Sequence, residues 1–494
     1  MPTIEELRRE RVAKLQRLRE RGVDPYPAHF HRTHENASAA ALYVAHEERQ
    51  GAGTPGPVVT VAGRITALRD MGKAAFLDLR DGSGRLQAHL RRDVLGDAYA
   101  LLAELDLGDF LGVTGPLFRT RRGEITVEAH ELAFLAKALQ PPPAKWHGLQ
   151  DVELRYRRRY LDLLANKEVR DLFRTRSATV CAIRRFMDGR GFMEVETPVL
   201  QAEAGGAAAT PFVTHHRALD RDFYLRISLE LHLKRLLIGG YDRVYEIGRI
   251  FRNEGVSWKY NPEFTMMESY EAYADYHDVA RMVEELISTV AQEVLGTTKV
   301  SYGDTVIDLS PPWRRLTMRD AFIEYAGFDL EDYRGDRDSL LERARAMSVE
   351  VDPGWSWGKL VDEIFSNAVE PHLIQPTFLL DYPRELSPLA KAKADAPHLV
   401  ERFEAFCRGM EIANAYSELN DPLDQRERFL VQARLKAAGL EEVETLDEDF
   451  LLALEQGMPP AGGLGLGIDR LVMLLTGQQS IREVILFPHM RERE

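Results

Sequence analysis

The chain has 494 residues, 45% hydrophobic and 29% charged, so about two to four ordinary domains with a large core are expected. Its two cysteines, Cys181 and Cys407, exclude a disulfide framework and indicate a reducing compartment. No apolar run reaches the roughly 18 residues that a membrane span needs, which excludes a transmembrane protein. The N-terminus has no apolar signal core and mixes glutamates with its arginines, so we expect a cytoplasmic protein.

The formal net charge is −14, which argues against a surface that is positive everywhere but allows a local basic face. Residues 1–22 hold seven Arg or Lys against four Glu, a pattern that suits either a solvated helix face or a nucleic-acid contact. Residues 4–22 are predicted to form a charged helix, and a second helix is expected near 36–50. Residues 51–57, GAGTPGP, read as a linker, so that 1–56 is a helical extension.

Short runs rich in Val, Ile, Leu and Phe follow, separated by turns such as DGSG. They lie near 58–67, 74–80, 84–90, 109–118 and 123–134. Several short strands in so short a stretch suit a small closed barrel, and the five-stranded nucleic-acid-binding barrel, the OB-fold, is the leading candidate for 57–140. A generic barrel without a ligand is left open by this pattern.

PPPAK at 141–145 marks a boundary, so we assign 141–160 to a linker and 161–494 to a second domain. Two predicted hairpins, near 243–273 and 402–418, argue for an antiparallel sheet rather than repeated strand–helix–strand units. Helices are expected around this sheet at 168–190 and 277–295, with a mostly helical insertion near 317–370. The sequence therefore predicts an α+β fold with two main domains.

Several common catalytic signatures are missing: there is no GxxxxGK[ST] loop, no HExxH and no cysteine–histidine metal spacing. The stretch 245–273 is the most informative, because two strands flank a polar loop and the second strand alternates. Its even positions share one face: Phe264, Met266, Glu268 and Tyr270. Arg252 ends the first strand, where its guanidinium can hold a phosphate and a carboxylate together. An ordinary hairpin with a charged turn is the alternative, but Glu268 within an apolar strand needs a partner.

A second hairpin, 402–421, carries a pair of carboxylates. If Arg408 and Gly409 form a two-residue turn, Glu404 and Glu411 share a face and repel one another unless a cation lies between them. Mg²⁺ held by two carboxylates and nucleotide phosphates fits that demand, whereas a three-residue turn would separate the pair. A surface hairpin with scattered acids remains the alternative.

Two other polar residues of this hairpin, Asn414 and Glu418, have the opposite parity to Glu411. They reach the same pocket only through a β-bulge or from beyond the strand's end. Further along, GGLGLGIDR at 462–470 combines glycines that allow a flat ligand to approach with Arg470 in the first turn of a helix. Arg470 can stack on a base ring opposite Phe264, although a tightly packed strand–helix junction explains the same residues.

Together these elements resemble the class II aminoacyl-tRNA synthetases. GFMEVETPVL (191–200) resembles motif 1, FRNEG to NPEFTMME (251–268) resembles motif 2, and GLGLGIDR (463–470) resembles motif 3. Their order behind an OB-like barrel resembles the subgroup that serves Asp, Asn and Lys. The chain is most similar to the lysyl-tRNA synthetase family, as GGAAATPF (205–212) and SELND (417–421) also indicate.

The resemblance implies ATP-dependent activation of L-lysine and its transfer to the 3′ end of tRNA(Lys). It implies that Arg252 and Arg470 are catalytic and that ATP is bound by Arg252, Glu254, Tyr260, Asn261, Phe264 and Arg470. Glu404 and Glu411 would bind Mg²⁺. Lysine would be bound by Gly206, Glu230, Glu268, Tyr270, Asn414 and Glu418, with Tyr270 and Glu418 at the ε-ammonium. The tRNA anticodon would be read by Arg64, Phe76, Gln87 and Glu124.

Other implications concern assembly and departures from the family. Motif 1 in this class lies at a two-fold interface, so a homodimer is expected. Tyr260 stands where the family has histidine, and a phenol does not carry positive charge at neutral pH, which puts a cationic contact there in doubt. Phe76 also suits a place in the barrel core.

Three alternative functions are weighed. A lysine-activating paralogue with a non-tRNA acceptor resembles only the catalytic half, so the barrel argues against it. Aspartyl- and asparaginyl-tRNA synthetases fit poorly, because Glu230, Glu268 and Glu418 suit a dication such as lysine. A nucleic-acid-binding protein with a degenerate site conflicts with the intact Arg252 and Arg470.

Overall fold

The computed structural model describes residues 3–51, 53–142, 149–437 and 446–491. The chain divides into two compact units, Met1–Leu149 and Gln150–Glu494, each of which is treated by itself. Within the described ranges, no helix is long and apolar enough to cross a membrane.

The first unit is built around a closed barrel. Its strands are β1 (Val58–Asp70), β2 (Ala74–Arg80), β3 (Arg85–Arg91), β4 (Phe110–Arg119), β5 (Ile125–Glu128) and β6 (Glu131–Ala136). They pair in the order β1-β2-β3-β5-β4, β4 closes onto β1, and β6 runs beside β4. Alternate residues of β2, namely Ala75, Leu77 and Leu79, are fully buried in the barrel core. The alternation of apolar and polar residues therefore turns one face of β2 towards the barrel core.

Four further helical segments accompany the barrel: α1 (Ile4–Glu20), α2 (Asn36–Gln50), α3 (Arg92–Leu95) and the 3₁₀ segment η1 (Gly96–Glu104). Some of the basic side chains of α1 form hydrogen bonds and ion pairs within this unit. Arg11 donates hydrogen bonds to the carbonyls of Leu107, Ala138 and Gln140. Arg17 pairs with the buried Glu104. These side chains stabilise the packing of α1, whereas Arg8, Arg9 and Arg19 of the same helix are exposed.

The second unit contains an eight-stranded sheet in the order β15-β16-β17-β18-β19-β12-β11-β7. Its strands are β7 (Met193–Glu194), β11 (Arg243–Phe251), β12 (Glu263–Ala272), β15 (Arg314–Thr317), β16 (Thr377–Leu380), β17 (Arg402–Phe406), β18 (Glu411–Ser417) and β19 (Ala461–Gly467). The centre is antiparallel, as predicted, and the two edge pairs, β15–β16 and β7–β11, are parallel. The sheet is therefore mixed.

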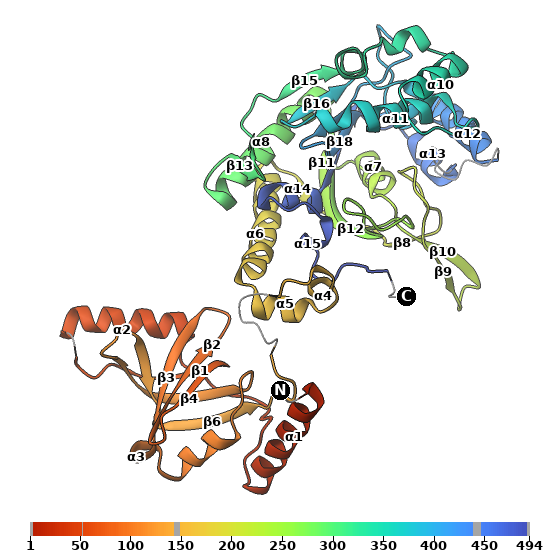
Figure 1. Ribbon diagram of the computed structural model, residues 1–494. Coiled ribbons are helices and arrows are strands. Elements are labelled where there is room, and N and C mark those ends of the chain that lie inside the picture. Colours follow the sequence, from red (N-terminus) through yellow and green to blue (C-terminus); the bar gives the residue numbers. More distant parts are fainter. Residues whose placement is uncertain (1–2, 52, 143–148, 438–445, 492–494) are drawn as a thin grey trace. The chain divides into compact units, whose positions relative to one another are not determined.

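One face of the sheet is covered by helices that form the main core of this unit. These are α6 (Lys167–Gly189), α8 (Tyr276–Leu295) and α14 (Ile468–Thr476), which pack on inward-facing residues such as Met267 and Leu466. On the other face α7 (Glu230–Ile238) packs against β11 and β12 through Leu229, Leu233 and Tyr270. Figure 1 shows α6, α8 and α14 on one side of β11 and β12 and α7 on the other.

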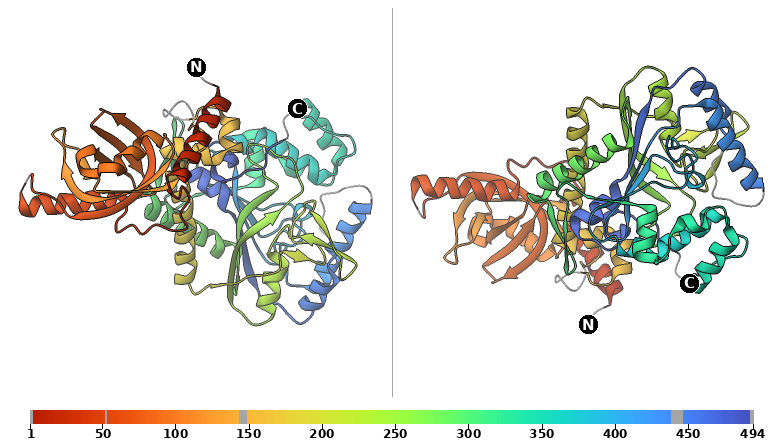
Figure 2. Two further views of the ribbon diagram at one scale, coloured as in Figure 1. Left: turned by 90° about the horizontal axis from the view of Figure 1, so that it is seen from below. Right: turned by 90° about the horizontal axis from the view of Figure 1, so that it is seen from above.

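The remaining elements complete this unit. They are α4 (Val152–Arg157), α5 (Arg159–Ala165), β8 (Leu200–Gln201), β9 (Val213–His216), β10 (Arg221–Leu225), β13 (Lys299–Tyr302), β14 (Thr305–Asp308), α9 (Met318–Ala321), α10 (Arg337–Ala346), α11 (Trp357–Ala368), α12 (Pro422–Ala437), α13 (Glu448–Leu454) and α15 (Ile481–Val484). Helices α9 to α11, with short π- and 3₁₀-turns, form a separate apolar cluster. Figure 2 shows α10 and α11 at the margin of the unit.

The segment assigned to a linker, 141–160, falls partly outside the described residues, at 143–148. Its later part forms α4 and the start of α5, and Arg159 there is fully buried. Arg159 donates to the carbonyls of Arg482, Ile485 and Leu486. This part of the arginine-rich run therefore supports the fold of the second unit.

Candidate active site

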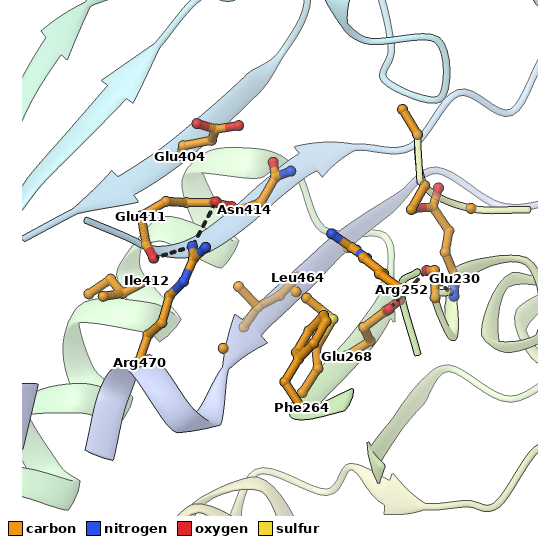
Figure 3. Close-up of a pocket in the computed structure, with 18 of the residues that line it drawn as sticks. Glu230, Arg252, Phe264, Glu268, Glu404, Glu411, Ile412, Asn414, Leu464 and Arg470 are labelled. Atoms are coloured by element: carbon orange, nitrogen blue, oxygen red, sulfur yellow. Dashed lines mark hydrogen bonds and ion pairs between the residues drawn. The ribbon is translucent and has the colours of Figure 1, made fainter. Parts of the chain in front are cut away.

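A pocket opens on the face of the sheet that carries α7 (Figure 3). Its lining includes most of the residues that the sequence indicates for ATP, lysine and Mg²⁺: Gly206, Glu230, Arg252, Glu254, Tyr260, Asn261, Phe264, Glu268, Tyr270, Glu404, Glu411, Asn414 and Arg470. They come from α7, β12, β17, β18 and α14, from the loop between β11 and β12, and from the loop that holds Gly206. Residues far apart in the sequence are thus brought to one cavity.

Strand β12 presents the predicted face to the pocket. Phe264, Met266, Glu268 and Tyr270 all line it, while Met267 points into the core on the other side. Arg252 follows β11 directly, and its guanidinium carbon lies 5.3 Å from the centre of the Phe264 ring. Its Nε donates to the Ile227 carbonyl, 3.3 Å away. The Phe264 ring and the Arg252 guanidinium therefore lie side by side in the pocket.

The β17–β18 hairpin has the two-residue turn on which the carboxylate argument depends. Arg408 and Gly409 both have positive φ, 61° and 63°, and the backbones of Cys407 and Met410 exchange two hydrogen bonds of 2.9 and 3.1 Å. This is the geometry of a tight type I′ hairpin, whose twist matches that of the strands. Phe406 pairs with Glu411, next to this turn.

Next to that pair, β18 contains a β-bulge. Ile412 is the extra residue, so that Ala405 faces Ala413 and Glu404 faces Asn414. The extra residue reverses the parity of the later part of β18, so Glu404, Glu411 and Asn414 share the pocket face. Glu418 lies one residue beyond the end of β18. The bulge therefore brings Asn414 into the pocket, whereas Glu418, beyond the strand's end, is not among the residues that line it.

Each carboxylate of this hairpin has a cationic partner. Arg402 Nη2 lies 2.6 Å from Glu404 Oε1, and the Tyr382 hydroxyl donates to Glu404 Oε2 at 2.8 Å. Arg470 Nη1 lies 3.0 Å from Glu411 Oε2 and also donates to the Glu411 carbonyl. Burial raises the pKa of Glu404 to about 7, although Arg402 opposes the shift.

These carboxylates suit a magnesium ion that shares its coordination with a phosphate. Among the described residues, no group of three or more His, Cys, Asp or Glu side chains is arranged to hold a metal. Mg²⁺ commonly takes one or two protein carboxylates and completes its octahedron with water and substrate phosphates. Glu404 and Glu411 on one pocket face fit that mode of binding.

Glu268 is the buried carboxylate of β12. Its Oε1 accepts hydrogen bonds from Ser228 Oγ at 2.9 Å and from the Leu229 amide at 2.8 Å. Its Oε2 accepts one from the Tyr270 hydroxyl at 3.0 Å. Burial, followed by the charge of Glu230, raises the pKa of Glu268 to about 7. The carboxylate is therefore poised to gain or lose a proton near neutral pH.

A buried lysine lies behind this end of the pocket. Lys234 Nζ is 2.5 Å from Glu230 Oε1 and is ion-paired with Glu418 Oε2. The Tyr416 hydroxyl donates to the other oxygen of Glu230. Glu418 itself is 1% exposed, and its Oε1 has no hydrogen-bond partner among the described residues. Burial raises the pKa of Glu418 well above its ordinary value, an effect that Lys234 opposes.

Strand β19 approaches these groups without a side chain. A Cβ atom at Gly463 would lie 1.9 Å from Glu418 Oε1 and 2.6 Å from Tyr270 Cε1, far inside van der Waals contact. At the end of the same strand, Asp469 accepts hydrogen bonds from the Thr265 amide and from Arg176 of α6. The glycine strand thus brings Glu418 against Tyr270, and Asp469 fixes the start of α14.

Arg470, which is predicted to stack on the adenine, lies over an aromatic ring of the protein. The Arg470 guanidinium carbon lies 5.7 Å from the centre of the Tyr260 ring, which is the residue that replaces histidine. Asn261 is held by backbone contacts, because its Nδ2 donates to the Glu263 carbonyl and its Oδ1 accepts from the His489 amide. The pairing of Phe264 with Arg470 around a base stays a prediction.

Sequence reasoning missed the polar residues that support this pocket: Lys234, Arg402, Tyr382, Tyr416 and Ser228. Only Lys234 had a readable signal. It lies four residues after Glu230 in the apolar stretch LELHLKRLL, where a charged pair at helical spacing is unusual unless it is buried together. The other partners depend on how distant segments pack.

Of the residues predicted to read the anticodon, in the other unit, Arg64, Phe76 and Gln87 lie on strands of the barrel and Glu124 directly precedes β5. Phe76 is half-buried outside the core and stacks on His89, with ring centres 4.4 Å apart and planes 8° apart. Gln87 accepts from Thr126 Oγ1, and Glu124 pairs with Arg85. Arg64 donates to the Gly108 carbonyl and lies over Phe110.

Comparison with protein families identifies the class. A model of the class II tRNA synthetases (D, K and N) matches residues 151–491, and a model of the OB-fold nucleic acid binding domain matches residues 59–135. The first match covers well over half of the chain, which therefore belongs to the class II tRNA synthetases.

Individual relatives narrow the class. A lysine–tRNA ligase of Dehalococcoides mccartyi is 57% identical over 99% of this chain and 98% of its own length. Those of Pelotomaculum thermopropionicum and Moorella thermoacetica are 55% identical over 99% and 98% of this chain and 96% and 97% of their own lengths. The chain is thus an aminoacyl-tRNA ligase of the lysine–tRNA ligase family. The predicted family and fold are confirmed, and the roles of single residues stay predictions.

The raised pKa of Glu268 gives a testable pH dependence. A carboxyl that ionises near pH 7 when folded and near 4.3 when unfolded keeps its proton in the folded state, so stability falls as pH rises through 7. Between pH 6 and 8 this group costs the ligand-free protein about 1 kcal/mol of unfolding free energy. We expect Glu268→Gln, which stays neutral, to lose less stability over that range in urea unfolding. Parallel pH profiles for the two proteins would contradict the assignment.

Proposed function

We propose that this chain activates L-lysine with ATP and transfers it to the 3′ end of tRNA(Lys), with lysine at the Glu268 end of the pocket and ATP at the Arg470 end. The observation that carries the assignment is the distribution of charge along one cavity (Figure 3). Three buried carboxylates gather around Tyr270, Arg252 lies beside Phe264 and Glu268, and Arg470 is paired with Glu411 at the other end (Figure 3).

The lysine end suits a substrate with two ammonium groups. Glu268 and Glu230, with Gly206 and Asn414, would hold the α-amino end. Tyr270, with Glu418 just behind the pocket lining, would receive the ε-ammonium. Charge-assisted hydrogen bonds discriminate strongly in a site from which water is excluded. An aspartate side chain would meet uncompensated negative charge there, which disfavours the aspartyl and asparaginyl alternatives.

The nucleotide end would hold ATP through several contacts. Arg252 would bridge the α-phosphate and the lysine carboxylate, and Phe264 and Arg470 would enclose the adenine. Glu254, Tyr260 and Asn261 would contribute further contacts, with Tyr260 acting as a neutral donor. Mg²⁺ held by Glu404 and Glu411 would neutralise phosphate charge when bound.

Chemistry at this site requires no side-chain nucleophile. A lysine carboxylate oxygen attacks the α-phosphorus, the bond to the bridging oxygen breaks, and pyrophosphate leaves with its electron pair. A terminal ribose hydroxyl of tRNA then attacks the carbonyl of lysyl-adenylate, loses its proton, and AMP departs. Arg252 holds the two reactants in line and stabilises the negative charge that develops between them, which is catalysis by positioning and electrostatics.

The barrel is proposed as the anticodon reader. Phe76 would act as a stacking platform, and Gln87 and Glu124 would contact base edges, which is how single-stranded loops are recognised. Arg64 would contribute a phosphate contact, and the exposed arginines of α1 would add backbone contacts. Retention of this unit disfavours a paralogue with a non-tRNA acceptor.

A homodimer through the motif 1 region is also proposed. Apolar side chains are exposed on the segment that follows α6: Met193, Val199, Leu200, Val213 and Leu219. Exposed apolar clusters of this kind mark interaction surfaces. The division of the chain at 56, 140 and 160 likewise stands as a proposal beside the two compact units.

Amino-acid-dependent exchange of labelled pyrophosphate into ATP tests the activation step without tRNA. We expect exchange with L-lysine alone among the twenty amino acids, in the presence of Mg²⁺. Exchange with aspartate or asparagine would overturn the pocket assignment but keep the class. No exchange by folded protein would favour a degenerate site.

Phe76→Ala separates anticodon reading from activation. Loss of one stacked base is expected to raise the KM for tRNA(Lys) about tenfold, since such stacking is worth about 1–3 kcal/mol. Lysine-dependent pyrophosphate exchange should not change. Val58→Ala, which removes an exposed apolar side chain from β1, is the matched control and should leave both activities intact. An unchanged KM for tRNA in Phe76→Ala would show that the ring serves only the fold.

A further inference from the structure

Lys234 is a fully buried charge for which the proposed chemistry has no use. It lies on α7, its side chain is 0% exposed, and its ammonium is shared by Glu230 and Glu418. Neither Lys234 nor Glu418 belongs to the pocket lining, so the ammonium stands behind the wall that the substrate would touch. Both of its partners are residues that would bind lysine.

The alternative is that Lys234 only neutralises two acids to keep the fold stable. Buried ion pairs are expensive to desolvate and are weak stabilisers compared with apolar residues of the same size. A pair that existed for stability would also satisfy both oxygens of Glu418. Instead Lys234 is ion-paired with Oε2 alone, neither oxygen accepts a hydrogen bond among the described residues, and Oε1 lies beside Tyr270.

The charges at this end match those of the substrate only when Lys234 is counted. When all three are ionised, Glu230, Glu268 and Glu418 with one ammonium leave two negative charges, and L-lysine brings two ammonium groups. Without Lys234 there would be three carboxylates for two cations. The excess would be relieved by protonation of a carboxylate, because like charges in a buried cluster cannot all remain ionised.

We propose that Lys234 is a positioning residue for lysine recognition: it fixes Glu230 and Glu418 and sets the charge of the site to that of a diammonium substrate. This inference rests on the proposed function. Lys234 holds one oxygen of each carboxylate, and Tyr416 holds the second oxygen of Glu230. Glu418 Oε1 is then the oxygen presented to the ε-ammonium.

The groups around Lys234 come from several elements. Glu230 lies on its own helix, Tyr416 lies on β18 and Glu418 just beyond it, and the ring of Phe450 on α13 packs 5.9 Å from Nζ. Glu268 and Tyr270 of β12 interact electrostatically with the same carboxylates. Burial opposes the charge on Lys234, but Glu230 and Glu418 outweigh it and raise its pKa, so the ammonium is charged throughout the working range.

Lys234→Met tests the proposal, since methionine keeps the length of the side chain and removes its charge. In pyrophosphate exchange we expect the KM for lysine to rise at least about tenfold, the usual scale for a lost charged hydrogen bond, while the KM for ATP stays within about twofold. The acidic limb of kcat/KM for lysine should move to higher pH, because Glu418 loses the positive charge that opposes the rise in its pKa.

Lys137→Met is the matched control. Lys137 is likewise fully buried between two carboxylates, Asp106 and Asp109, but in the barrel unit. Its loss should weaken the barrel and leave both the KM for lysine and the pH profile unchanged. If Lys234→Met does not fold, as judged by circular dichroism and ATP binding, Lys234→Gln provides the same comparison.

Two results would overturn the proposal. An unchanged KM for lysine in a folded variant would show that Lys234 does not act on the substrate site. Equal losses for lysine and ATP with an unshifted pH profile would show a structural role alone. Wild-type exchange with lysine is measured in the same series, so a failure of the proposed function would appear there and not be mistaken for a failure of this inference.

Discussion

Burial of carboxylates on one face of a sheet is the constraint on which the catalytic unit depends. An unpaired buried carboxylate is costly, and several together repel one another. Each therefore has a partner: Glu404 has Arg402 of the same strand and Tyr382 of another segment, Glu411 has Arg470, and Glu268 has the Leu229 amide. These partners hold the β17–β18 hairpin, α14 and β19 in fixed positions relative to one another. The shape of the pocket and the stability of the fold therefore depend on the same contacts.

This constraint explains why the two ends of the cavity differ. Around Glu404 and Glu411 the cationic partners are arginines, whose planar forks can also reach a phosphate. At the other end the partners are one lysine, two phenols, the Ser228 hydroxyl and the Leu229 amide. The same sheet thus carries a face that favours anions beside one that favours cations.

Sequence patterns predicted the strands and their faces well, because period-two alternation and turn chemistry are local. The face of β12 and the Arg408–Gly409 turn are examples. The bulge at Ala405 was recognised only as one way to bring Asn414 into the pocket, because a local insertion in the ladder has no signature in these residues. The rule that residues two apart share a face of a strand therefore holds only up to the first bulge in that strand.

Partners across elements were the part that could not be predicted. Arg402 lies two residues from Glu404 and faces the same way, yet only the packed hairpin shows that it also donates to Asn414. Phe76 suited the core or the surface equally well until the barrel placed its neighbours Ala75 and Leu77 inside. Contacts of this kind depend on tertiary packing between distant segments, which leaves no periodic pattern in a single sequence.

Gly463 has a consequence for attempts to redesign the enzyme. A shorter diamino acid is usually accommodated by adding bulk to the floor of a pocket, but no side chain fits between Glu418 and Tyr270 at this position. Substitution of Gly463 would therefore disturb the packing of these two residues rather than reshape the pocket. A Cβ atom at Gly465 or Gly467 would lie 3.3 Å or more from its neighbours, so the constraint within β19 falls on Gly463 and not on these two glycines.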